Sequence, residues 1–337
     1  MFAKRRTFLK TLAASPALYL GVPRFARAAP EFVYKYANNL PMSHPLNVRA
    51  QQAADRIKKE SNGRLQINIF PNNQLGGDTD MLTQVRAGAV ELYTPSALVI
   101  ATVVPEAAIS AVGFAFSNYD QVWAAMDGKL GTFVRQQIGK SHLHTFEKMW
   151  DNGFRQVTTS SKPVKTAADL HGVKIRVPVS PLSISMFKAL SSSPTSLQFS
   201  ELYTSLQTHI VDAQENPLAI IQSAKLYEVQ KYCSLTNHIW DGYWFVANQR
   251  AFDKLPANLR TLWETAFNDA GMKQREDLRK MNESIQSDLQ NKGMVFNTTQ
   301  SDSFQAALRN AGFYKEWRGK FGEQAWSQLE GAVGKLA

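Results

Sequence analysis

The order of strand-like and helix-like segments constrains the fold of this 337-residue chain more than any other feature of its sequence. Residues 32–39 and 64–70 are strand-like, and residues 43–63 between them repeat apolar side chains at helical spacing. A second helical segment, 79–88, leads into strand-like residues 90–94. Strand, helix, strand, helix and strand in this order are typical of an α/β unit with a parallel sheet.

A second α/β run begins near Gly153. Its clearest strand is 173–177, in which apolar residues alternate with Lys174 and Arg176. The alternation places the two cations on the face opposite the apolar residues, where water is the common environment of a charged side chain. Residues 255–289 follow as a mostly helical stretch that would measure on the order of 50 Å. We therefore expect two α/β lobes of similar size and a long helix that bridges them.

Residues 1–28 have the features of a bacterial export signal. A cationic start precedes a short apolar stretch and a small-x-small cleavage site at 26–28, and Arg5 and Arg6 resemble the twin-arginine class. This segment holds six positive charges and no negative one, so most of the net charge of +10 belongs to it. The remaining positive charge is too small and too scattered to indicate nucleic-acid binding. We expect a mature protein that starts near Ala29 and resides in the periplasm.

Motifs for other functions are absent from the sequence. Residues 98–116 have the length of a membrane span, but Pro105 and Glu106 lie near their centre, so we expect a buried strand, a break and a second buried segment. Cys233 is the only cysteine, which excludes an intrachain disulfide. No zinc-ligand spacing or nucleophile motif occurs. The sequence predicts no metal and no cofactor, although acid and base residues of an enzyme need not be neighbours in sequence.

Four stretches together resemble one known family, the periplasmic substrate-binding components of tripartite ATP-independent periplasmic (TRAP) transporters. They are "IFPNNQLGGD" (69–78), "DNGFRQVTTSSKPVKTAADLHGVKIRVP" (151–178), "LQFSELYTSLQTHIVDAQENP" (197–217) and "KLYEVQKYCSLTNH" (225–238). The likeness runs in order over nearly the whole chain after the signal. It implies a two-lobed clamshell that captures a small carboxylate and passes it to an integral-membrane permease.

The resemblance also implies how the chain is divided. The first lobe would comprise residues 29–152 plus about 242–281, and the second lobe would comprise residues 153–241 plus about 282–337. We expect the protein to act as a monomer and to perform no catalysis.

Four residues of the second lobe would hold the ligand if the resemblance is followed position by position. Arg176 would form a bidentate ion pair with the ligand carboxylate, for which a planar and permanently charged guanidinium is suited. Asn216 would donate its amide to the same carboxylate. Phe199 would wall the ligand, and Arg155 would be a second cation.

The first lobe is less distinctive. Asn39 and Asp78 match positions that face the cleft in relatives that bind sialic acid, although Asp78 could serve only as a helix cap. Ser96 departs from those relatives, which carry an acidic residue there. Trp150 and Trp240 flank the expected crossovers between the lobes, where they could stack on a ligand ring or simply pack.

Two alternatives remain open from the sequence. One is a secreted α/β enzyme acting on an organic acid, with Asp78, Glu215 or a histidine as the acid or base. The other is the binding protein of an ATP-driven importer. The sequence does not choose among a dicarboxylate, a sugar acid, a keto acid and an aromatic acid as the ligand.

Overall fold

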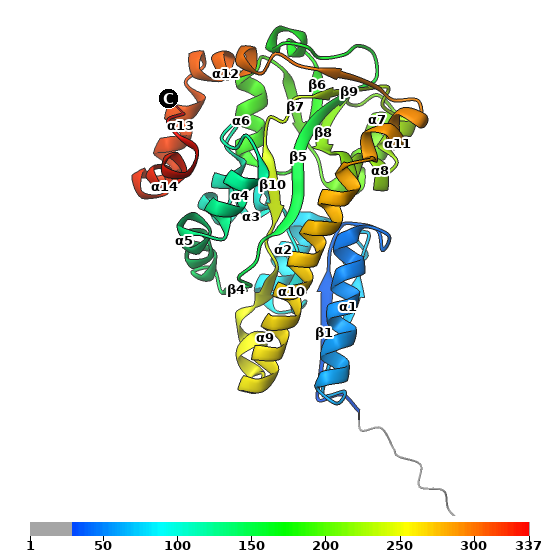
Figure 1. Ribbon diagram of the computed structural model, residues 1–337, viewed down its shortest axis with the longest axis vertical. Coiled ribbons are helices and arrows are strands. Elements are labelled where there is room, and N and C mark those ends of the chain that lie inside the picture. The colour runs from blue at the N-terminus through cyan, green and yellow to red at the C-terminus, as the bar shows by residue number, and fades with distance from the viewer. Residues whose placement is uncertain (1–28, 337) are drawn as a thin grey trace, which may run out of the picture.

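The computed structural model describes residues 29–336, which form two α/β lobes, each built on its own sheet (Figure 1). The first sheet has five strands and the second has seven. The predicted two-lobed α/β fold is therefore confirmed. The expected export signal, residues 1–28, lies outside the described residues.

The first sheet follows the predicted alternation of strands and helices. Its strands, in spatial order, are β2 (Leu65–Phe70), β1 (Phe32–Ala37), β3 (Leu92–Tyr93), β11 (Val246–Asn248) and β4 (Leu143–Thr145). β1 is parallel to β2 and β3, because helices α1 (Pro45–Glu60) and α2 (Asp78–Ala87) provide the crossovers between these strands. β11 returns late in the sequence and is antiparallel to β3 and β4.

The second sheet is of mixed direction. Its strands, in order, are β12 (Val295–Thr298), β9 (Tyr232–Leu235), β5 (Trp150–Thr159), β8 (Ala213–Pro217), β6 (Lys174–Val177) and β7 (Ser193–Ser196), and β10 (Trp240–Tyr243) pairs with β5. β5 is antiparallel to β8, β9 and β10, whereas β6 is parallel to β7 and β8. On β6 only Lys174 faces water, and Arg176 is 1% exposed. The solvated face that the strand pattern suggests is therefore wrong for Arg176.

The apolar stretch 98–116 is buried as expected, but it contains no strand. It begins with the short helix α3 (Ala97–Ile100) and continues into the 3₁₀ helix η1 (Pro105–Ala111). The hydroxyl of Ser96 accepts a hydrogen bond from the backbone N–H of Leu98 and so caps α3. The segment is apolar on both faces, so its sequence has no hydrophobic periodicity that would distinguish a strand from a helix. The cap at Ser96 favours the helical conformation.

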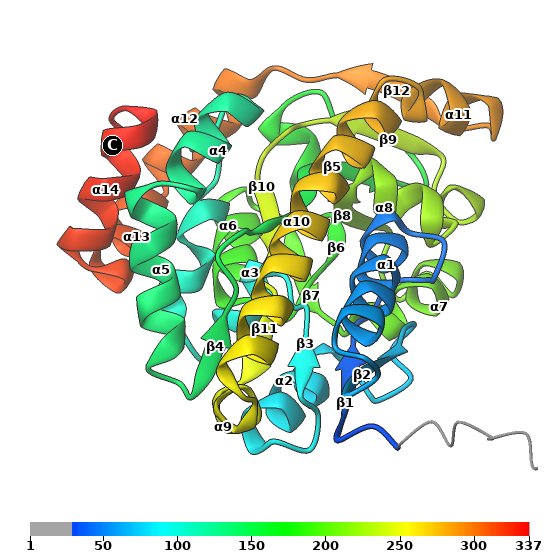
Figure 2. The same ribbon diagram turned by 60° about the horizontal axis from the view of Figure 1, so that its bottom comes forward.

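The chain passes between the lobes three times, between β4 and β5, between β10 and β11, and along α10 (Ala257–Asn282). With 26 residues, α10 is about 39 Å long and contacts α1 in the first lobe and β5, α8 (Leu218–Ser223) and α11 (Ile285–Asn291) toward the second (Figure 2). The bridging helix is confirmed. It ends at Asn282, before α11, so 255–289 is not one continuous helix.

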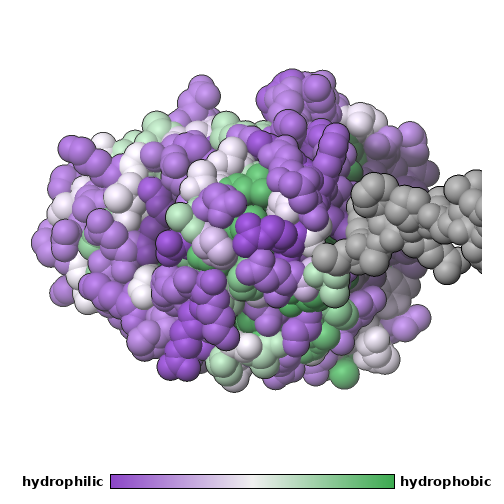
Figure 3. Space-filling model, turned by 90° about the horizontal axis from the view of Figure 1, so that it is seen from below, coloured by the Kyte–Doolittle hydropathy of each residue, from purple (hydrophilic) through white to green (hydrophobic). Residues whose placement is uncertain are grey.

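The remaining helices cover the flanks of the two sheets. They are α4 (Tyr119–Met126), α5 (Lys129–Gly139), η2 (Ala167–Leu170), α6 (Pro181–Ala189), η3 (Phe199–Glu201), α7 (Leu202–Gln207), η4 (Leu226–Glu228), α9 (Gln249–Lys254), α12 (Ser301–Asn310), α13 (Phe313–Phe321) and α14 (Glu323–Val333). The last helix packs on α4, α5 and η1. Hydrophilic side chains cover most of the face seen from below (Figure 3). Among residues 29–336, no helix has both the length and the apolar character needed to cross a membrane.

A close contact joins α10 to β5 where the chain first crosses between the lobes. A Cβ atom on Gly271 would lie 2.6 Å from Nε1 of Trp150, whose indole is fully buried beside Phe245 and Phe267. Because the ring is enclosed, it has little room to move aside. Gly271 is therefore required by packing rather than by backbone conformation.

We predict that Gly271→Ala lowers the free energy of unfolding by roughly 1–3 kcal/mol, because overpacking outweighs the gain in helix propensity of about 1 kcal/mol. Urea denaturation measures the change. Gly319→Ala in α13 is the matched control, since a Cβ atom there meets nothing within 4 Å, and it should be neutral or stabilising. A stabilised Gly271→Ala protein would contradict the packing argument.

Asp151, beside Trp150, is a buried carboxyl with an unusual pKa. Burial raises its pKa from 3.8 to about 7, although hydrogen bonds from Trp240 and Tyr119 oppose the rise. The folded state therefore binds this proton more tightly than the unfolded state does. It follows that this carboxyl lowers the free energy of unfolding as the pH rises from 3.8 to about 7.

We predict that Asp151→Asn becomes more stable relative to the parent as the pH is raised from about 5 to about 8, by up to about 3 kcal/mol. Urea denaturation of both proteins at the two pH values gives the difference. Asp302→Asn, at an exposed position of α12, should have the same free energy of unfolding as the parent at both pH values. A constant difference between Asp151→Asn and the parent would argue against a raised pKa.

Candidate functional site

Arg176 is a buried cation that has no close acidic partner in the part of the chain that the structure describes. Its Nε and Nη2 atoms donate to the carbonyl oxygen of Leu197, at 3.0 and 2.7 Å, because β6 and β7 lie side by side. Among the described residues, no carboxylate oxygen forms an ion pair with it within 4.0 Å. Burial lowers its pKa to about 10, and the charges of Asp78 and Glu215 oppose that change. The guanidinium is therefore charged at neutral pH and poorly compensated.

Asp78 is a residue of the first lobe whose charge acts on Arg176. It is the first residue of α2, and Gly77 rather than Asp78 is the N-cap, so its carboxylate is available for other contacts. Asn39 donates to its Oδ1 at 2.8 Å, and the backbone N–H of Phe199 in the second lobe points to its Oδ2 at 3.4 Å. Burial raises the pKa of Asp78, and the charge of Arg176 opposes the rise.

Gln198 links the two lobes beside Asp78. Its Oε1 accepts from the backbone N–H of Asp78 at 2.9 Å, and its Nε2 donates to Oγ1 of Thr79 at 2.6 Å. Phe199 follows it and packs, half-buried, against the hydrophobic clusters of both lobes. The start of α2 and the segment after β7 thus meet through a short set of directed contacts.

Most hydrogen-bond donors of Arg155 are engaged by protein groups. It forms ion pairs with Glu215 and Asp241, and it donates to the side-chain oxygen of Asn216 at 3.1 Å. Glu215 also contacts Nε2 of His238 at 3.1 Å. Burial alone would raise the pKa of Glu215, but the charge of Arg155 and the hydrogen bond from His238 hold it at about 2. This buried network joins β5, β8 and β10.

Asp241 connects that network to Ser96 in the first lobe. Its Oδ2 accepts from Ser96 at 2.7 Å, from Asn152 at 2.9 Å and from Arg155 at 3.1 Å, whereas its buried Oδ1 has no partner among the described residues. Tyr243 carries a pKa raised first by burial and then by the charge of Asp241. The charges of Arg155 and Asp78 also act on this hydroxyl.

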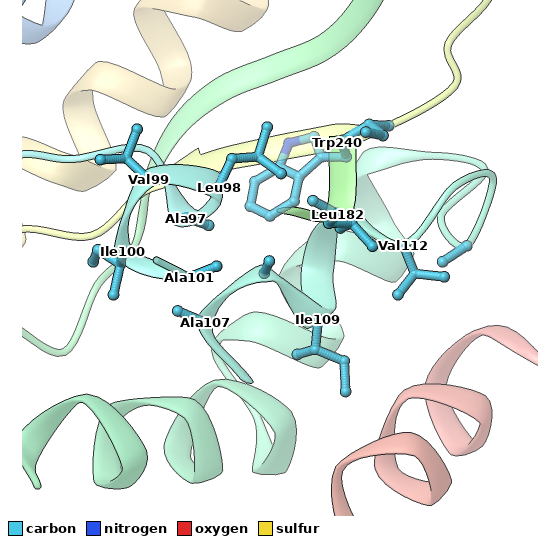
Figure 4. Close-up of a cluster of buried hydrophobic side chains, with 14 of the residues drawn as sticks. Ala97, Leu98, Val99, Ile100, Ala101, Ala107, Ile109, Val112, Leu182 and Trp240 are labelled. Carbon is cyan, nitrogen blue, oxygen red and sulfur yellow. The ribbon is translucent and has the colours of Figure 1, made fainter. Parts of the chain in front are cut away.

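Trp150 and Trp240 lie in the protein interior at the crossovers. Trp150 is enclosed by Phe245 and Phe267, and its Nε1 has no partner among the described residues. Trp240 donates to Asp151 at 3.0 Å and packs beside Leu98 (Figure 4). Both rings therefore contribute to the core.

The structure brings together most of the residues that the sequence indicates. Arg176, Asp78, Asn39 and Phe199 lie around one point between the lobes, and Arg155, Asn216 and Ser96 belong to the adjoining ionic network. Sequence reasoning missed two members of that network, namely His238 and Asp241. It named Glu215 only as a possible acid or base of an enzyme. The quoted stretches contain Glu215 and His238, but no local pattern marks them as partners.

Within the described part of the chain, no three His, Cys, Asp or Glu residues are grouped in positions that could hold a metal ion. Cys233 is buried in β9, and burial raises the pKa of its thiol above the ordinary value. Its surroundings therefore do not activate it as a nucleophile.

Comparison with known sequences matches residues 36–318 to the family described as bacterial extracellular solute-binding protein, family 7. One similar protein is the 2,3-diketo-L-gulonate-binding periplasmic protein YiaO of Escherichia coli, 32% identical over 265 residues that cover 78% of this chain and 80% of that protein. The sialic acid-binding periplasmic protein SiaP of Vibrio cholerae is 27% identical over 83% of this chain and 86% of that protein.

Solved structures agree with this match. The sugar acid binding protein DctPAm of Advenella mimigardefordensis, in complex with galactonate, has a TM-score of 0.86 and 27% identity, over 92% of this chain and 99% of that one. A TRAP periplasmic solute binding protein of Sulfurospirillum deleyianum with bound succinate has a TM-score of 0.85 and 25% identity, over 90% and 99%. The predicted resemblance is confirmed, and the chain belongs to family 7 of the bacterial extracellular solute-binding proteins, the solute-binding components of TRAP transporters.

Proposed function

We propose that this protein captures a small organic acid between its lobes and delivers it to a TRAP membrane permease. The observation that carries the proposal is the state of Arg176, a buried and charged guanidinium for which residues 29–336 provide no acidic partner within ion-pair distance. A desolvated cation is costly unless an anion compensates it. A ligand carboxylate would supply that anion and could bind two-pronged to Nη1 and Nη2, since the Nε edge of the guanidinium already donates to Leu197.

The other predicted site residues either contact the ligand or support the residues that do. Asp78, Asn39 and Phe199 would contact the ligand from the walls of the site. Arg155 would act mainly through its network, because its hydrogen-bonding groups already engage Glu215, Asp241 and Asn216. Asn216 and Ser96 would help to position that network while remaining close to the ligand. Trp150 and Trp240 are not included, since both lie in the core.

Relatives support the chemical class and the compartment. Structures similar to this one contain bound succinate, D-erythronate and galactonate, all of which carry a carboxylate. Similar proteins from Escherichia coli and Vibrio cholerae are named as periplasmic. We propose the periplasm for this chain as well, with residues 1–28 as an export signal of the twin-arginine type.

The same comparisons favour binding over catalysis. The matched family and the similar structures are solute-binding proteins, so an enzyme acting on an organic acid is the weaker interpretation. Membership of a TRAP family also argues against service to an ATP-driven importer. We propose a monomer that returns its ligand chemically unchanged.

We predict that Arg176→Ala weakens binding of the acid by about 2–5 kcal/mol, because the ligand carboxylate loses its charge partner in a desolvated site. Arg176→Lys should also lose much of the affinity, since an ammonium cannot form the two-pronged contact. The acid is first selected by a thermal-shift screen, and affinities are then measured by calorimetric titration.

Lys174→Ala is the matched control for this experiment. Lys174 lies on the same strand but is exposed, so its loss should leave the affinity unchanged. Melting temperatures of all three variants separate loss of binding from loss of folding. Parent-like affinity of a folded Arg176→Ala protein would exclude Arg176 as the anchor.

We predict that saturation with the selected acid lowers the radius of gyration in small-angle scattering, because the lobes close around the ligand. Gln198→Ala should start from a more open average and bind about tenfold more weakly, since two contacts that favour closure are lost. Gln207→Ala, at an exposed position of α7, should resemble the parent. An unchanged scattering profile at demonstrated saturation would contradict closure.

A further inference from the structure

The described residues provide the site with positive charge for only one carboxylate. Among residues 29–336, the arginine and lysine side chains that are buried are Arg155, Arg176 and Arg275. Arg275 is bound to Asp127 and lies over the ring of Trp123, on the flank of α10. Arg155 is already neutralised by two carboxylates. Among the described residues, Arg176 therefore remains the single buried cation that can compensate a ligand anion.

Acidic groups surround the rest of the site. Asp78, Glu215 and Asp241 are all buried there, one on each of three elements. If they are ionised, Asp78 and Asp241 repel a second ligand carboxylate. If burial keeps Asp78 and Asp241 protonated, the two neutral carboxyl groups still provide no positive charge for a second ligand carboxylate. In either protonation state, a second carboxylate would be desolvated without a counter-ion.

The same region contains hydrogen-bond acceptors that lack donors. Oδ1 of Asn39, Oδ1 of Asn152 and Oδ1 of Asp241 are buried and have no partner among the described residues. The orientation of both amides follows from their neighbours, because each NH₂ group must face a carboxylate oxygen, that of Asp78 or Asp241. The amide oxygens of Asn39 and Asn152 therefore have no donor among the described residues. Unsatisfied acceptors of this kind are stabilised by a donor such as a hydroxyl group.

We infer that the site takes an acid with a single carboxylate and several hydroxyl groups, in preference to a dicarboxylate. The inference rests on the proposed function, with Arg176 as the carboxylate anchor. Hydroxyl groups of the ligand would then donate toward Asp78, Asp241 and the two asparagine oxygens. A carbon chain without hydroxyl groups would leave these acceptors unsatisfied.

Two matched series of acids test the inference by calorimetric titration. The six-carbon series is D-gluconate, D-glucarate and hexanoate, and the four-carbon series is D-erythronate, meso-tartrate and butyrate. In the series that binds, the hydroxylated monocarboxylate should exceed both other members by at least about tenfold in affinity. A dicarboxylate that binds as tightly as the hydroxylated monocarboxylate overturns the inference, and so does binding by neither series.

The proposed function and the inference can fail separately. Tight binding of glucarate or tartrate that is lost in Arg176→Ala would keep Arg176 as the anchor and refute only the selectivity. Binding of any acid that is unchanged in Arg176→Ala would refute the anchor itself.

Substitution of the acidic wall provides an independent test. Asp78→Lys adds a positive charge at the acidic wall whether or not Asp78 is ionised, so it should reduce the preference for the monocarboxylate over the dicarboxylate of the same series severalfold. Asn39→Lys, at a half-buried position beside Asp78, serves as the second variant, should Asp78→Lys fail to fold, and Asp302→Lys on the surface of α12 is the control. An unaltered preference in a folded Asp78→Lys or Asn39→Lys protein overturns the inference.

Discussion

The buried ion pairs of Arg155 hold the centre of this molecule together. They connect β5 to Glu215 on β8 and to Asp241 on β10, and Ser96 attaches the same network to the first lobe. Buried charges are expensive to desolvate, and removal of one partner typically costs about 3–5 kcal/mol. The network therefore orients three strands at the crossover. Arg176 is left as a buried cation without an acidic partner among the described residues, and the proposed function depends on it.

Much of the architecture could be predicted because it depends on local periodicity. The spacing of apolar residues in α1 and the alternation in β1 and β2 place the first parallel strands, and the length of the helical stretch indicates a bridge between lobes. Arg176 and Asp78 could be named from the resemblance, since both lie within the quoted stretches. The conformation of residues 97–111 could not be predicted, because both of its faces are buried and no period remains to distinguish strand from helix.

The ionic network could not be predicted from local patterns either. The resemblance names Arg155 as a second ligand cation, but no strand pattern reveals which acids will face it. Its partners Glu215 and Asp241 lie 60 and 86 residues away in sequence, and the antiparallel pairing of β5 with β8 and β10 brings them together. Such pairings are a property of the sheet as a whole.

The site is divided unequally between the lobes, and this has an evolutionary consequence. The proposed carboxylate anchor and its supporting ion pair lie on strands of the second sheet, at Arg176, Arg155 and Glu215. Asn39 and Ser96, from the first lobe, lie outside its strands, in segments that tolerate sequence change more readily than a packed sheet does. A descendant of this protein could therefore acquire a new solute through substitutions in the first lobe, while the carboxylate anchor and its supporting network are inherited intact.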